Sequence, residues 1–212
     1  MNKAPHLLDR FLAIPNRDAY GTIRGFLYQA VLTIQAWLRL PVTEIIELEA
    51  GEDIDWRFLA EEAVSSRKDA DRVLGQVKYR GKGLSLRSEV SLSCLVTFHE
   101  HRLRNPGLRL QFRLLSNAAI AQERGHIHPS GLKGIELWES LKAVTDPIER
   151  KARLNFLRSV LLAPSEPPSI NRMQLKNFRE FVRTCSDEKF LDFVDSFTWM
   201  KISGDLERVR NR

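Results

Sequence analysis

Carboxylate, amide and ammonium groups are concentrated between residues 45 and 80. Asp53 and Asp55 lie two residues apart in a run of acids, and Gln76 and Lys78 lie two residues apart in the stretch Val73–Tyr79. Residues two apart on a strand share one face of the sheet. The spacing therefore predicts a sheet face that carries carboxylate, amide oxygen and ammonium groups together.

Such a face has a clear chemical use. Carboxylate and carbonyl oxygens are the ligands that Mg²⁺ prefers in proteins. A metal held there would polarise a phosphodiester and activate water, and a nearby lysine would stabilise the developing negative charge. The alternative is a solvated acidic loop followed by a strand with one exposed lysine, because runs of charge usually face water.

The two segments are expected to pair as an antiparallel hairpin that turns near residues 65–66. In that register Asp53 faces Lys78 and Asp55 faces Gln76. The chemistry needs only a shared face, so it does not depend on this exact register.

The surrounding elements follow from apolar periodicity. A helix is predicted over Gly21–Leu40 and ends at Pro41. Its predicted buried stripe consists of Ile23, Phe26, Leu27, Ala30, Val31, Ile34 and Leu38. A strand is predicted over Ile45–Leu48, a helix over Ser88–Arg104, and a strictly alternating strand over Leu108–Leu115. The order of helix, three strands, helix and strand is that of an α/β/α core.

The C-terminal third is predicted to be helical. The expected helices are Ile135–Val144, Pro147–Leu162, Ser169–Cys185 and Asp187–Ile202, with a break at Pro164–Pro168. We therefore divide the chain into a core of residues 1–134 and a helical extension of residues 135–212. The extension is expected to pack on the core or to form an assembly surface.

The order of the motifs resembles a nuclease family. Gly21–Gln29 reads GTIRGFLYQ and opens the first helix, a strand ends at Glu49, and E-D-I-D and Q-V-K follow. Over residues 18–117 this resembles the nuclease domain of CBASS-associated (CD-NTase-associated) DNA endonuclease effectors and related anti-phage nucleases. These belong to the PD-(D/E)xK, restriction-endonuclease-like superfamily, whose α/β/α core has a mixed sheet flanked by helices.

The resemblance implies roles for individual residues. Asp53 matches the metal-binding acid, Gln76 the middle motif position and Lys78 the catalytic lysine. The Val77 main-chain carbonyl would join Asp53 and Gln76 around the metal. Gln76 stands where the parent motif has an acid, as in relatives that resemble the Mrr branch. The auxiliary positions implied by the resemblance are Glu49, Asp55 and Gln29.

The implied function is Mg²⁺-dependent hydrolysis of double-stranded DNA, with Mn²⁺ as a substitute, by an effector of a bacterial anti-phage defence system. In the family the nuclease is tethered to a sensor or works with an ATPase or SMC-like partner. The chain is too short to include such a sensor, so we expect a piece of a longer protein or a subunit of an assembly, activated by homo-oligomerisation. The alternatives are a non-catalytic nucleic-acid-binding or assembly module and an RNA-cutting relative.

Charge and cysteine content are consistent with this interpretation. The net charge of +6 suits a polyanionic partner. The candidates for phosphate contacts are Arg24, Arg57, Arg80, Lys82 and Arg87. Cys94 and Cys185 are too far apart in sequence to indicate a disulfide framework or a metal site, which favours a cytoplasmic protein. We expect neither a signal peptide nor a membrane span, because no run of about 18 apolar residues occurs.

Overall fold

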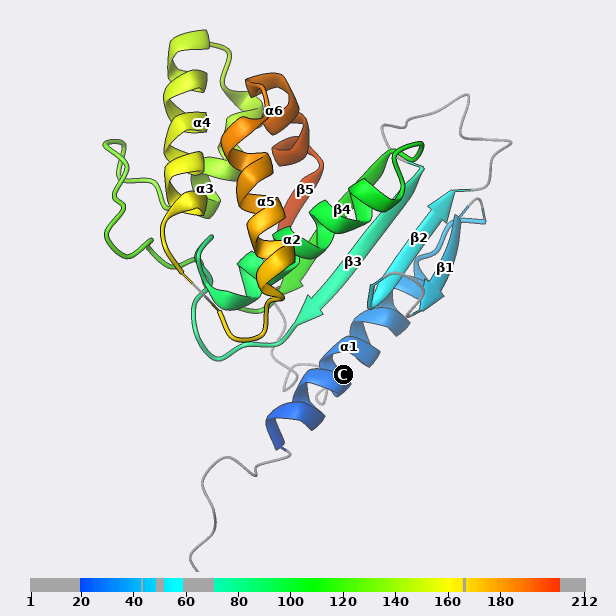
Figure 1. The fold of residues 1–212 in the computed structure, drawn as a ribbon. Helices are drawn as coiled ribbons and strands as arrows, with labels where there is room; N and C mark the ends of the chain where they lie inside the picture. Colours follow the sequence, from blue (N-terminus) through cyan, green and yellow to red (C-terminus); the bar gives the residue numbers. More distant parts are fainter. Residues whose placement is uncertain (1–19, 43, 49–51, 59–70, 166, 203–212) are drawn as a thin grey trace, which may run out of the picture.

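A five-stranded mixed sheet forms the centre of the molecule (Figure 1). The computed structural model describes residues 20–42, 44–48, 52–58, 71–165 and 167–202. The strands lie in sequence order across the sheet: β1 (Glu44–Leu48), β2 (Ile54–Phe58), β3 (Arg72–Lys78), β4 (Leu110–Ser116) and β5 (Phe197–Lys201). The β1–β2 and β2–β3 pairs are antiparallel, and the β3–β4 and β4–β5 pairs are parallel.

Six α-helices and one 3₁₀ turn belong to the described part of the chain. They are α1 (Tyr20–Leu38), α2 (Glu89–Arg104), α3 (Gly134–Ser140), the 3₁₀ turn η1 (Leu141–Ala143), α4 (Pro147–Leu162), α5 (Arg172–Thr184) and α6 (Asp187–Asp195). Polar side chains accept main-chain N–H groups at the starts of four of them, as expected for N-caps. These caps are Ser88, Asp146, Asn171 and Ser186.

The two faces of the sheet bury different helices, because side chains alternate along each strand. Leu74 and Phe112 belong to the larger core, which also contains buried side chains from α2 to α6. Val77 and Leu115 belong to the smaller core, together with Tyr28 and Leu32 of α1. Figure 1 shows α2 to α6 gathered at the β3–β5 part of the sheet and α1 toward β1 and β2. The prediction of an α/β fold with a mixed sheet flanked by helices is confirmed.

The predicted buried stripe of α1 is wrong. Phe26, Leu27 and Leu38 are exposed, whereas Tyr28 and Leu32 face the sheet. The helix carries large apolar residues on nearly all its sides, so periodicity alone offers more than one stripe. The contact with the sheet decides which side is buried.

The predicted helix over Asp187–Ile202 is also wrong in its second half. Helix α6 ends at Asp195, and Phe197–Lys201 form the fifth strand beside β4. Phe197 is fully buried and stacks on Phe112, with ring centroids 5.0 Å apart. The larger core therefore contains residues from both sides of residue 134, and the division at that position remains a prediction.

The predicted β2–β3 register is shifted by two residues. Ile54 pairs with Gly75 and Asp55 pairs with Leu74, whereas we expected Asp55 to face Gln76. A shift of two keeps every side chain on its expected face, since the period of a strand is two. The connection that was expected to turn at residues 65–66 lies outside the described residues. Within the described ranges, no helix is long and apolar enough to cross a membrane.

Candidate functional site

The side chain of Asp53 is attached to the main chain of β3. Asp53 lies immediately before β2, and its Oδ2 accepts a hydrogen bond from the N–H of Val77 at 2.7 Å. Extending the β2–β3 register by one residue sets Asp53 opposite Gln76. The N–H and carbonyl of a paired strand residue point to the same neighbour, so the Val77 carbonyl also faces the Asp53 side. The Asp53 carboxylate and the Gln76–Lys78 segment of β3 therefore lie side by side.

The Gln76 side chain lies against α2. The Cys94 thiol donates a hydrogen bond to Gln76 Oε1 at 2.6 Å. Burial raises the pKa of the Cys94 thiol, and the charges of Glu52 and Asp53 act in the same direction while the charge of Lys78 opposes them. Cys94 is therefore a neutral donor that orients the amide. Lys78, Glu52 and Asp53 are therefore all near enough to Cys94 to influence its pKa.

Glu52 is a site residue that the motif comparison missed. Its Oε1 lies 3.2 Å from Nε2 of His101 on α2, and its side chain is largely buried. The only sequence signal was its position next to Asp53 in the acidic run. His101 lies two turns further along α2 than Cys94. Helix α2 therefore contacts the site twice, through Cys94 at Gln76 and through His101 at Glu52.

Asp55 belongs to an ion-pair network further along the hairpin. Asp55 is fully buried, and its Oδ2 lies 2.5 Å from Nη2 of Arg72. Arg72 also contacts Glu47, and Glu47 contacts Arg57. Asp55 shares the face of Gln76 and Lys78, yet its carboxylate neutralises a guanidinium within the sheet. Its implied auxiliary role remains a prediction.

Of the two other auxiliary positions, Gln29 is separate from this place. Gln29 is half-buried on α1, which packs against Val77 and Leu115 on the opposite face of the sheet from Gln76 and Lys78. Glu49 lies outside the described residues. Arg24 is exposed on α1.

Three of the predicted phosphate contacts line one cavity of about 520 Å³ beyond the end of β3. Arg80, Lys82 and Arg87 surround it, and Arg124 adds a fourth cation that the sequence comparison did not select. We call this the loop cavity. Arg57 is not part of its lining, since it lies on β2 and pairs with Glu47 of β1.

The wall of the loop cavity is held by side chains of the segment after β4. The Asn117 amide accepts from the N–H of Arg80 at 2.7 Å and donates to its carbonyl at 3.0 Å. The buried Glu123 carboxylate accepts from the N–H groups of Leu86 and Arg87. Because both ends of the loop are attached to one neighbouring segment, its cations are presented from a fixed backbone.

The donor set suits a hard cation with several water ligands. Asp53 and Gln76 each use one oxygen lone pair within the protein, which leaves further lone pairs on both groups. Mg²⁺ is usually bound by one or two carboxylates together with waters and substrate phosphates. Across the described ranges, no group of three or more His, Cys, Asp or Glu side chains could hold a metal ion. In the described residues, Asp53 and Gln76 thus have unused oxygen lone pairs, but no closed protein cage for a metal ion is formed.

Comparisons with protein-family models, with curated proteins and with solved structures give no match for this chain.

Proposed function

We propose that this protein is a Mg²⁺-dependent nuclease that hydrolyses phosphodiester bonds of double-stranded DNA. The observation that carries the proposal is the hydrogen bond from the Val77 N–H to the Asp53 carboxylate. It keeps the Asp53 carboxylate beside the strand that carries Gln76 and Lys78. Such a reaction needs a carboxylate, an amide oxygen and an ammonium group.

Three groups of this chain would hold the ion: the Asp53 carboxylate, the Gln76 amide oxygen and the Val77 carbonyl. When bound, Mg²⁺ supplies Lewis-acid stabilisation of the phosphate and a more acidic water. Cys94 contributes indirectly, because its thiol fixes the direction of the Gln76 amide oxygen.

Lys78 would act on the reacting phosphate. It shares a face with Gln76, since the two are separated by one strand residue. Its ammonium group would stabilise the negative charge that develops on the phosphate oxygens and orient the attacking water.

The loop cavity would hold the DNA backbone next to the reacting phosphate. Arg80 lies two residues beyond Lys78, and Lys82, Arg87 and Arg124 continue the lining. Contacts of Arg and Lys to phosphates position DNA without reading its sequence. We therefore expect binding that depends on salt and little on base sequence.

The biological setting rests on the motif resemblance alone. It implies a cytoplasmic effector of bacterial anti-phage defence that works as a homo-oligomer or with a sensor, ATPase or SMC-like subunit. A single chain that is fully active on DNA without a partner would count against this part of the proposal.

The test is cleavage of plasmid DNA with Mg²⁺ by the wild type, Lys78→Ala and the control Lys142→Ala, whose lysine lies on η1. We expect Lys78→Ala to lose activity by a factor on the order of 100 to 1,000, as for removal of one transition-state donor. The control should retain wild-type activity. Equal activity of Lys78→Ala and the wild type would overturn the assignment.

A second candidate function is a nucleic-acid-binding module of the same fold that does not cut. The observation that favours it is the Asp55–Arg72 ion pair, which occupies the last acid of the E-D-I-D motif. Calorimetry with Mn²⁺ separates the two, because only the nuclease should show binding that is lost in Asp53→Asn. Offering RNA in the same cleavage assay tests the RNA-cutting alternative.

A further inference from the structure

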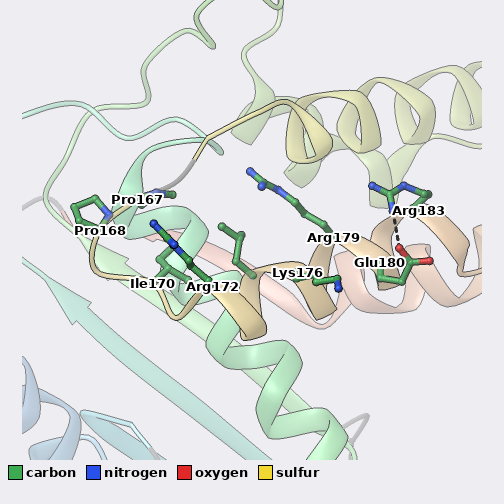
Figure 2. A pocket seen from close by; sticks show the side chains of 9 residues that line it. Pro167, Pro168, Ile170, Arg172, Lys176, Arg179, Glu180 and Arg183 are labelled. Atoms are coloured by element: carbon green, nitrogen blue, oxygen red, sulfur yellow. Dashed lines mark hydrogen bonds and ion pairs between the residues drawn. The ribbon is translucent and has the colours of Figure 1, made fainter.

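A second basic cavity of about 640 Å³ lies along α5, away from the residues of the motif. Its lining includes four cations, Arg172, Lys176, Arg179 and Arg183, and one acid, Glu180. Figure 2 shows these side chains spaced along the helix, with Pro167 and Pro168 beside its start. We call this the α5 cavity.

The basic stripe follows from the amphipathic pattern of α5. Leu175, Phe178 and Val182 are buried in the larger core and fix which side of the helix faces inward. The four cations recur at intervals of three or four residues, which places them along one side of a helix. The core contact therefore turns the whole stripe toward the cavity.

Part of the stripe is held in place by the protein. Nη2 of Arg179 donates to the carbonyls of Ala163 and Ser165 at 3.2 and 2.7 Å. Arg183 is paired with Glu180 at 2.5 Å, shown by the dashed line in Figure 2. Arg172 and Lys176 are exposed. A fixed guanidinium and exposed cations together form a surface that attracts anions.

The two basic cavities meet at the segment that precedes α5. Nη2 of Arg87, in the lining of the loop cavity, donates to the Pro164 carbonyl at 2.9 Å. Arg179, in the lining of the α5 cavity, donates to the residues on either side of Pro164. The Ser169 N–H also donates to Glu89 of α2 at 3.3 Å. Neighbouring carbonyls of one short segment thus join the two sets of cations.

We propose that the α5 cavity is a second contact for a nucleic-acid phosphate backbone, continuous with the loop cavity. The stripe from Arg172 to Arg183 is about 17 Å long, from a helix rise of about 1.5 Å per residue. At about 3.4 Å per nucleotide of one strand, this length matches roughly five nucleotides. The ligand class rests on the proposed function, but binding along α5 requires no cleavage. A hollow lined by separated cations fits a strand of phosphates better than a flat lipid surface.

The test measures binding of a 30-base-pair DNA duplex at several salt concentrations with a chelator present. The test variant carries Arg172→Gln and Lys176→Gln. The control carries Lys142→Gln and Lys189→Gln, which remove the same charge from exposed positions on η1 and α6 that line neither basic cavity. We expect about tenfold weaker binding by the test variant and a slope of log K against log salt that is smaller by about 1.8, for two lost phosphate contacts. The control should bind like the wild type.

The charge-conserving variant Arg172→Lys with Lys176→Arg should keep the wild-type slope, which separates loss of charge from loss of folding. Equal weakening in test and control variants would overturn the inference, and so would binding of the test variant that equals the wild type. Loss of binding to phosphatidylserine vesicles with unchanged DNA binding would assign the cavity to a membrane surface and also overturn it. Because a chelator is present, DNA binding along α5 can hold even if the Lys78 cleavage test fails.

Discussion

The carboxylate of Asp53 accepts the main-chain N–H of Val77 at 2.7 Å, across the end of the β2–β3 pair. This bond replaces the ladder hydrogen bond that β3 lacks beyond the start of β2 at Ile54. The same carboxylate thus completes the sheet and belongs to the candidate site.

Removing the Asp53 carboxylate should therefore reduce stability as well as activity. In Asp53→Ala the N–H of Val77, a buried residue, loses its acceptor, at a cost of about 1 to 3 kcal/mol. Asp53→Asn keeps an acceptor oxygen and should lose much less. Urea unfolding of the two variants checks this; equal losses would show that the bond contributes nothing to folding.

Asp53→Asn should lose metal binding while keeping most of its stability. Asp53→Asn removes the negative charge while keeping the fold, so calorimetry should show Mn²⁺ binding for the wild type and none for the variant. If the wild type and Asp53→Asn give the same heat signal with Mn²⁺, the proposed metal site is absent.

The Asp55–Arg72 pair predicts a large coupling between two substitutions. In Arg72→Met the fully buried Asp55 carboxylate loses the guanidinium beside it. Removing one partner of a buried ion pair typically costs about 3 to 5 kcal/mol. The double variant Asp55→Leu with Arg72→Met should be markedly more stable than Arg72→Met alone. Additive losses in chemical denaturation would contradict the prediction.

Gly75 is required by the packing of Trp56 on the α1 side of the sheet. A Cβ added at Gly75 would lie 2.5 Å from Cζ3 of Trp56. The Trp56 ring also lies under the guanidinium of Arg113, 5.6 Å from its centroid. Gly75→Ala should displace the ring and cost about 1 to 3 kcal/mol.

Thermal unfolding and tryptophan fluorescence measure the effect of Gly75→Ala. Gly107→Ala is the matched control, because nothing lies within 4 Å of a Cβ added there. If the two variants are equally stable, the packing of Trp56 does not require a glycine at position 75.

Glu123 predicts a pH-dependent stability. Burial raises the pKa of its carboxyl, against the hydrogen bonds from Leu86, Arg87 and Ser85 and the charge of Arg87. A raised pKa means that the folded protein binds the proton more tightly than the unfolded chain. The resulting stabilisation is complete below the unfolded pKa of about 4.5 and is lost as the pH rises through the folded value.

Glu123→Gln removes this titration. The stability of the wild type minus that of the variant should therefore fall as the pH rises from about 4.5 toward neutrality. Urea unfolding at a series of pH values measures this difference. A difference that is constant or rises with pH would contradict the prediction.

Local sequence signals located most elements because they depend on neighbouring residues. The helix predicted over Pro147–Leu162 matches α4, since Asp146 caps it and Pro147 occupies its first turn. The strict alternation of Leu108–Leu115 corresponds closely to β4. The helix predicted through Phe197–Lys201 was wrong because aromatic and apolar residues suit a helix or a strand. Pairing with the edge of β4 selects the strand.

The sequence by itself determined the alternation that puts Gln76 and Lys78 on one face, since that follows from the two-residue period of any strand. It also determined that α5 has a row of basic residues beside a row of apolar ones. Only the tertiary structure decided that Asp53 attaches to Val77, that Arg72 engages Asp55, and that Cys94 meets Gln76. These contacts join residues 17 to 24 positions apart. Their formation depends on the packing of whole elements, about which the local residue pattern contains no information.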